Sequence, residues 1–148
     1  LVQLGFDTHA DHDSNHEPLM AHTTDSLDYL WNYAEELGIA DRLTVVVGSD
    51  FGRTPFYNGF EGKDHWPIGS VMVMEKNAAW GNQIVGATDE AQNAQRINPS
   101  TLMQDDSSGT IIYPKHIHKA LRNYFGIGNS AASQLFPLSN TETFNFFG

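Results

Sequence analysis

Apolar residues recur along the chain with two different spacings, and each spacing predicts a different secondary-structure element. Between Leu19 and Leu37 they recur every three or four positions, which predicts a helix with one apolar face. Pro18 suits the first turn of this helix, because its missing N–H needs no partner there, and Gly38 is placed to end it. The β-branched run at 43–47 instead predicts a strand buried on both faces.

The same reading predicts further elements on either side of these two. Residues 1–6 read as a short strand ending at Asp7, residues 70–75 as another strand, and residues 82–85 as a possible extra strand. A helix is predicted over 114–125, since apolar residues share one of its faces and glycines follow it.

The remaining segments read as loops and a tail. Residues 51–68 form a Gly- and Pro-containing loop long enough to be functional. Residues 86–112 are polar and lack periodicity, which indicates a loop-rich insertion, and residues 130–148 form a Phe-containing tail expected to pack on the body. We expect residues 1–148 to be either a single domain or the carboxy-terminal part of a larger α/β domain.

The order strand, helix, strand with a short connection predicts a right-handed parallel β-α-β unit, and therefore an α/β fold. In open parallel sheets, ligands bind at the carboxyl ends of the strands. Asp7 and Asp50 follow two of the predicted strands, so we expect both carboxylates at one edge of the sheet.

Composition narrows the classes of partner. The formal net charge is −10, which argues against nucleic acid as a partner because phosphate contacts need a basic face. Cysteine is absent, so thiol catalysis and thiolate metal sites are excluded. No apolar run reaches the roughly 18 residues of a membrane span.

Carboxylates and imidazoles gather at the two predicted strand ends. Asp7 and His9 follow the first strand with His12 close behind, and they are candidate metal ligands. Such a mixture suits zinc, manganese or iron, whereas carboxylates with water suit calcium or magnesium. The alternative is a solvated loop whose Asp and His residues cap the next helix, which applies most to His16 and His22.

The second strand end carries Asp50 and Arg53, and His65 lies in the loop that follows. Asp50 is a candidate metal ligand or general base, unless it caps the turn. Arg53 is a candidate clamp for a phosphate or sulfate, since its planar fork matches such oxyanions; an ion pair with Asp50 is the alternative. His65 is a candidate ligand, with Asp64 placed to orient its ring.

Three ordered motifs resemble one protein family. Gly5-Phe6-Asp7-Thr8-His9, then residues 45–54 (VVVGSDFGRT) with Asn58, then Gly62-Lys63-Asp64-His65 resemble the bacterial domain of unknown function 1501, whose members look similar to the alkaline phosphatase and sulfatase superfamily. The chain departs from the family pattern at Asp50, where Glu is more usual. It also has Phe51 where phosphatases carry a His ligand.

The resemblance implies a three-layer alkaline-phosphatase-like fold with a mostly parallel sheet and flanking helices. It implies a hydrolase of phosphate or sulfate esters that binds a divalent metal, either zinc, manganese or calcium. Asp7 with His9 or His12 would serve one ion, and Asp50 with His65 another.

The resemblance also sets expectations about the rest of the protein. The nucleophile would come from a missing amino-terminal half, the substrate would be a small-molecule or glycan ester, and the location would be periplasmic or secreted. The alternative that we keep open is a non-catalytic, secreted binding or assembly protein with a degenerate metal site.

Overall fold

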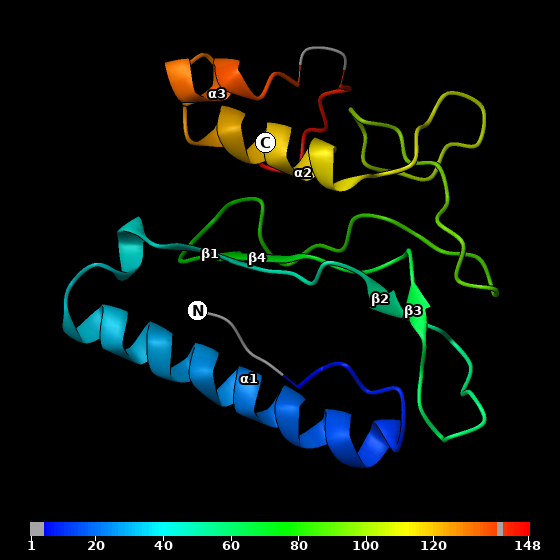
Figure 1. Cartoon of the computed structure of the whole chain (residues 1–148). Helices are drawn as coiled ribbons and strands as arrows, with labels where there is room; N and C mark the ends of the chain where they lie inside the picture. The colour runs from blue at the N-terminus through cyan, green and yellow to red at the C-terminus, as the bar shows by residue number, and fades with distance from the viewer. Residues whose placement is uncertain (1–4, 139–140) are drawn as a thin grey trace. The chain divides into compact units, whose positions relative to one another are not determined.

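The computed structural model describes residues 5–138 and 141–148. The chain divides into two units, Leu1–Ala78 and Ala79–Gly148, here called the N-terminal and C-terminal units. Figure 1 shows the elements of both. Among the described residues, no helix combines the length and the apolar character that crossing a membrane requires.

A long helix dominates the N-terminal unit and confirms the first predicted helix. Helix α1 spans His12–Glu36, so it begins earlier than predicted and contains Pro18 in its interior. Asp11 precedes it in the left-handed region at φ 46°, which stops the helix from extending further back. The Ser14 hydroxyl donates to Asp11 O at 3.0 Å and closes this first turn. The Asp13 carboxylate also favours the turn, because it lies near the positive end of the helix dipole.

After the short 3-10 helix η1 (Ala40–Arg42), strand β1 (Thr44–Val47) pairs with strand β4 (Met72–Glu75). The pairing is antiparallel, with Thr44 opposite Glu75 and Val47 opposite Met72. In Figure 1, α1 lies alongside this pair of strands. Both strands confirm the positions of predicted ones, although β4 is shorter than the predicted segment. The expected burial of β1 on both faces is wrong, because Val46 is 47% exposed.

This pairing overturns the predicted three-layer, alkaline-phosphatase-like fold with a mostly parallel sheet. The described residues form two sheets of two antiparallel strands each. The prediction failed because a β-branched run fits a parallel or an antiparallel partner equally well. The expected strand at 1–6 is not seen as a parallel neighbour of β1 in the part of it that the structure describes, because Gly5 has φ 103°, which is not an extended conformation. Residues 1–4 of that prediction lie outside the described residues.

The second sheet lies within the predicted loop 51–68. Strands β2 (Gly52–Arg53) and β3 (His65–Trp66) pair antiparallel, with Arg53 opposite His65. This short pair brings the two ends of the loop together. It therefore places two of the predicted site residues side by side.

The C-terminal unit is built on helix α2 (Pro114–Tyr124), which confirms the predicted helix, and the shorter helix α3 (Ala131–Leu135). The possible strand at 82–85 is wrong: Asn82 has φ 58°, and the Ile84 side chain is fully exposed. Buried apolar residues of this unit are Ile97, Ala120 and Phe144, whereas those of the N-terminal unit are Ala34 and Ala40.

Candidate metal centre

Three of the predicted ligands converge in the N-terminal unit. The Asp7 carboxylate oxygen Oδ1 lies 2.9 Å from His9 Nδ1 and 3.6 Å from His65 Nε2. One donor atom from each residue lies within 4.8 Å of the other two. The Asp7 side chain is 73% exposed, so a ligand from solvent can reach the group.

Arg53, in strand β2, anchors the Asp7 carboxylate of this group. Its Nη2 donates to Asp7 Oδ1 at 2.6 Å, and its Nη1 donates to the Lys63 carbonyl at 3.0 Å. The hydrogen bond from Arg53 lowers the pKa of Asp7 below its usual value. The carboxylate is therefore ionised at neutral pH and can bind a cation. The Arg53 side chain is only 14% exposed, which fixes the guanidinium in place.

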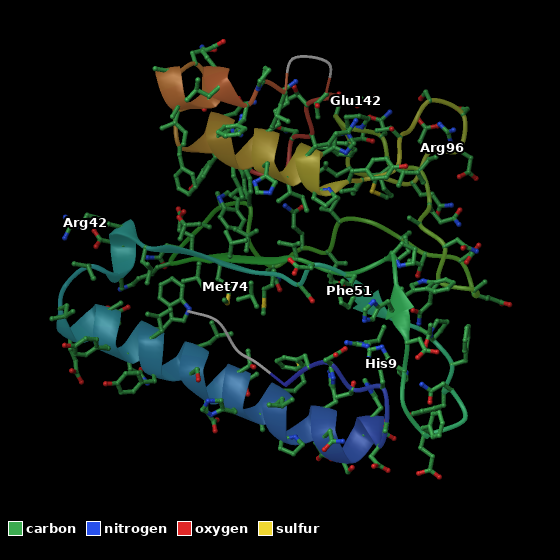
Figure 2. All side chains as sticks on the ribbon, viewed as in Figure 1. His9, Arg42, Phe51, Met74, Arg96 and Glu142 are labelled. Carbon is green, nitrogen blue, oxygen red and sulfur yellow. The ribbon has the colours of Figure 1, made fainter. Side chains whose placement is uncertain are left out.

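Phe51 forms an aromatic wall beside the group. Its ring centroid lies 3.9 Å from that of His65, with 31° between the ring planes. The Arg53 guanidinium carbon lies 5.5 Å from the Phe51 ring centroid, within the range of a cation–π contact. Figure 2 labels Phe51 and His9 close to β2 and β3. Phe51 thus restricts the orientation of the His65 ring.

Asn58 is the main structural residue that the sequence analysis left without a role. Its Nδ2 donates to the His9 carbonyl and to Asp64 Oδ1, both at 3.0 Å. Its Oδ1 accepts from the backbone N–H groups of Phe60 and Gly62. One amide therefore ties the loop to the segment that carries His9. The signal for this role in the sequence was the position of Asn58 between the motif at 45–54 and the motif that begins at Gly62.

Gly62 allows the closest approach of the two segments. A Cβ atom on this residue would lie 1.9 Å from the His9 carbonyl carbon and oxygen. Next to it, the Lys63 N–H donates to the Thr8 carbonyl at 3.0 Å. Only glycine fits here, so the geometry of the whole group depends on Gly62.

Two threonines that flank the group have structural partners. Thr8 is 3% exposed, and its hydroxyl lies 2.6 Å from His12 Nδ1. Thr54 is 5% exposed; its hydroxyl donates to the Phe56 carbonyl and accepts from the Asp64 N–H. Neither hydroxyl is accessible to a substrate. The Asp64 carboxylate is bonded to Asn58, and no bond from it to the His65 ring is seen among the described residues.

His12 is buried and belongs to a separate cluster, in which His16 is half-buried. Its ring stacks on that of His16 with centroids 4.5 Å apart, and the His16 ring in turn packs edge-on against Phe6. Burial lowers the pKa of both histidines, so they are neutral at physiological pH. The structure thus groups His12 with Thr8 and His16, not with the donor atoms of Asp7, His9 and His65.

Asp50 also lies outside the group. It is exposed, and its carboxylate has no hydrogen bond or ion pair with any residue that the structure describes. It therefore does not pair with Arg53, which binds Asp7 instead. The roles of Asp50 as ligand or base stay predictions.

The donor set is compatible with particular metals. Two imidazole nitrogens and one carboxylate oxygen are ligands typical of zinc and manganese sites, and three protein ligands leave a position open for water or substrate. Calcium fits less well, because it takes six to eight oxygen ligands.

The N-terminal unit therefore carries a convergent Asp–His–His group with an adjacent arginine, the arrangement of a candidate metal centre. The family described as protein of unknown function (DUF1501) matches residues 1–122, and the chain belongs to this family. The match confirms the family predicted from the three motifs. No curated protein and no solved structure matches the chain.

Proposed function

We propose that this chain provides a metal site to a hydrolase of phosphate or sulfate esters, with Asp7, His9 and His65 as ligands. The observation that carries the proposal is the convergence of three donor atoms beside an immobilised arginine. Zinc or manganese is the proposed ion, since two of the three donors are imidazoles.

When bound, such an ion would act as a Lewis acid toward the ester and lower the pKa of a water ligand. The chain's own residues prepare the site for it. The ionised Asp7 supplies negative charge, and the Phe51 ring keeps the His65 imidazole from rotating freely. The hydrogen bonds of Asn58 hold the backbone of His9 at the site.

Arg53 is the proposed contact for the ester's anionic oxygens. Its bonds to the Lys63 carbonyl and to the Asp7 carboxylate fix the guanidinium in place, and its planar fork suits tetrahedral oxyanions. The same residue borders the Asp7 carboxylate, so an ester held by Arg53 lies next to the proposed ion. We propose a role in binding and in stabilising developing charge.

Water is the proposed nucleophile within this chain, because the hydroxyls of Thr8 and Thr54 are buried and bonded. From the resemblance to the alkaline phosphatase and sulfatase superfamily we propose shared chemistry only, because the antiparallel sheets do not fit that fold. In a longer form of the protein, a hydroxyl from an amino-terminal part would take the place of this water as nucleophile. A periplasmic or secreted location is also part of the proposal.

The test is hydrolysis of an aryl phosphate and an aryl sulfate by the chain with added zinc or manganese. We expect metal-dependent turnover that Arg53→Lys reduces at least tenfold, because lysine keeps the charge but loses the two-pronged contact. Arg42→Lys is the matched control, since Arg42 lies exposed in η1. Turnover that is independent of metal, or equal in both variants, would contradict the proposal.

A non-catalytic binding or assembly protein is the second candidate. It is favoured by the short 2.6 Å contact of Arg53 with Asp7, which already neutralises the one carboxylate of the group. Tight metal binding without turnover of either ester, in the chain or in a longer form of the protein, would favour this candidate over the hydrolase.

A further inference from the structure

The C-terminal unit contains a polar pocket far along the chain from the Asp7 group. The pocket has a volume of about 220 Å³ and lies between the second half of α2 and residues 128–138. That volume corresponds to roughly seven water molecules at about 30 Å³ each. Its polar lining side chains are Lys119, Arg122, Asn123, Asn129, Ser133 and Gln134.

Two cations of the pocket are half-buried and have no acidic partner. Lys119 and Arg122 are three residues apart on α2, so they share one helix face. The Lys119 ammonium donates to the Thr141 carbonyl, and Arg122 Nη1 donates to the Phe136 carbonyl at 2.7 Å. Neither forms an ion pair with a described residue. No other hydrogen bond from either cation to a residue that the structure describes is seen.

The charge around the pocket differs from that of the whole chain. The residues that line the pocket include Lys119 and Arg122 but no Asp or Glu, although the chain as a whole has 18 acidic and 8 basic residues. The nearby Glu142 is bonded to His116. Half-burying a cation without an acidic partner carries a desolvation cost that an anionic ligand offsets. The neutral side chains of the lining add amide and hydroxyl groups that can donate to such a ligand.

We propose that this pocket binds a small tetrahedral oxyanion, either free phosphate or the phosphate group of a small ester. Lys119 and Arg122 supply the charge, and their bonds to backbone carbonyls hold them in position for it. The amides of Asn123, Asn129 and Gln134 complete the contacts. The site is independent of the proposed metal centre, and most of it lies beyond the residues that match the family.

Gln134→Glu is the sharpest variant for this site. Gln134 is exposed, and no hydrogen bond of its side chain to a described residue is seen, so the change keeps the shape and adds one negative charge to the lining. Gln104→Glu is the matched control, because it adds the same charge to the C-terminal unit outside the pocket. Neither substitution touches the bonds of Lys119 or Arg122.

The experiment is a titration of the chain with inorganic phosphate at constant ionic strength, followed by amide NMR. We expect saturable shifts confined to residues 119–138, and an affinity at least tenfold weaker in Gln134→Glu, a change of about 1.4 kcal/mol. Gln104→Glu should bind as the unchanged chain does. Shifts that never saturate, or that spread over the whole chain, or equal weakening in both variants, would overturn the proposal.

A parallel titration with glucose 6-phosphate distinguishes the two sources of the oxyanion. Tighter binding of the ester assigns the pocket to small phosphate esters, and equal or weaker binding assigns it to the free ion. No metal is added in either titration, so the outcome is separate from that of the hydrolase proposal.

Discussion

Each unit places a histidine next to a carboxylate, but the two pairs differ in what their nitrogens can still bind. In the C-terminal unit, His116 is 1% exposed; its Nδ1 accepts from the Tyr113 N–H and its Nε2 lies 3.0 Å from Glu142 Oε2. In the N-terminal unit, the His9 and His65 side chains are 45% and 54% exposed around Asp7.

The contrast shows that residue type alone does not define a metal site. The hydrogen bond that His116 Nδ1 accepts leaves Nε2 as the donor to Glu142, so neither nitrogen has a free lone pair. His9 and His65 instead present nitrogens around one carboxylate that solvent can reach. We therefore assign His116 to stability and propose ligand binding for the Asp7 group alone.

Gly62→Ala is expected to lower the stability most, because Gly62 lies where the two segments of the N-terminal site approach each other most closely. The new Cβ would lie 1.9 Å from the His9 carbonyl, so the backbone must move. We expect a loss of at least about 3 kcal/mol in the free energy of unfolding, the upper end for overpacking. Urea unfolding measures it, with Gly59→Ala as control, since nothing lies within 4 Å of a Cβ there. Equal stability of the two variants would refute this packing.

His116→Ala removes the histidine–carboxylate pair of the C-terminal unit. It removes a buried ring and leaves the Tyr113 N–H and Glu142 without their partner, so we expect a loss of about 2 kcal/mol in unfolding free energy. His118→Ala, on the exposed side of the same helix, should change it by less than about 0.5 kcal/mol. Metal affinity should be unchanged in both. A metal defect in His116→Ala would contradict the division of roles.

A smaller, pH-dependent effect is expected from the stacked His12–His16 pair, in which His12 is buried and His16 half-buried. Burial lowers the pKa of both rings, so the unfolded chain binds protons more readily, and stability falls as the pH drops below the unfolded value of about 6.5. His16→Phe should reduce this fall, because it keeps an aromatic ring against Phe6 and removes a titrating group.

Urea unfolding at about pH 7.5 and about pH 5.5 measures the effect, since these values bracket the unfolded pKa of histidine. His22→Gln, an exposed position on the same helix, is the control and should show the same fall as the unchanged chain. If His16→Phe lost as much stability on acidification as the control, the His16 ring would not be the source of the pH dependence.

The two long helices and the family could be predicted from the sequence, whereas the short helix α3 and the pairing of the strands could not. The apolar spacing after Pro18 and the Pro114 start signal act within one segment, and both helices formed. The pairing of β1 depends on a partner far along the chain, and the antiparallel match with β4 leaves no trace in the residues 44–47 themselves. This is why a parallel sheet was expected and was wrong.

The candidate site was also predictable only in part. Asp7, His9 and His65 were all named from their motifs, and the structure brings them together through the β2–β3 pair. His12 and Asp50 shared those motifs, yet His12 turns toward Thr8 and Asp50 toward solvent. Such orientation depends on backbone geometry, including the left-handed Asp11, that residue types do not reveal.

Zinc binding measured by isothermal titration calorimetry is the most direct test of the central claim that Asp7, His9 and His65 form a metal centre. We expect one zinc ion per chain and an affinity at least tenfold lower in His65→Ala, with the affinity of His22→Ala unchanged, because losing a ligand costs at least as much as losing its outer-shell support. Equal affinity in His65→Ala and His22→Ala, or no saturable binding by the unchanged chain, would contradict it.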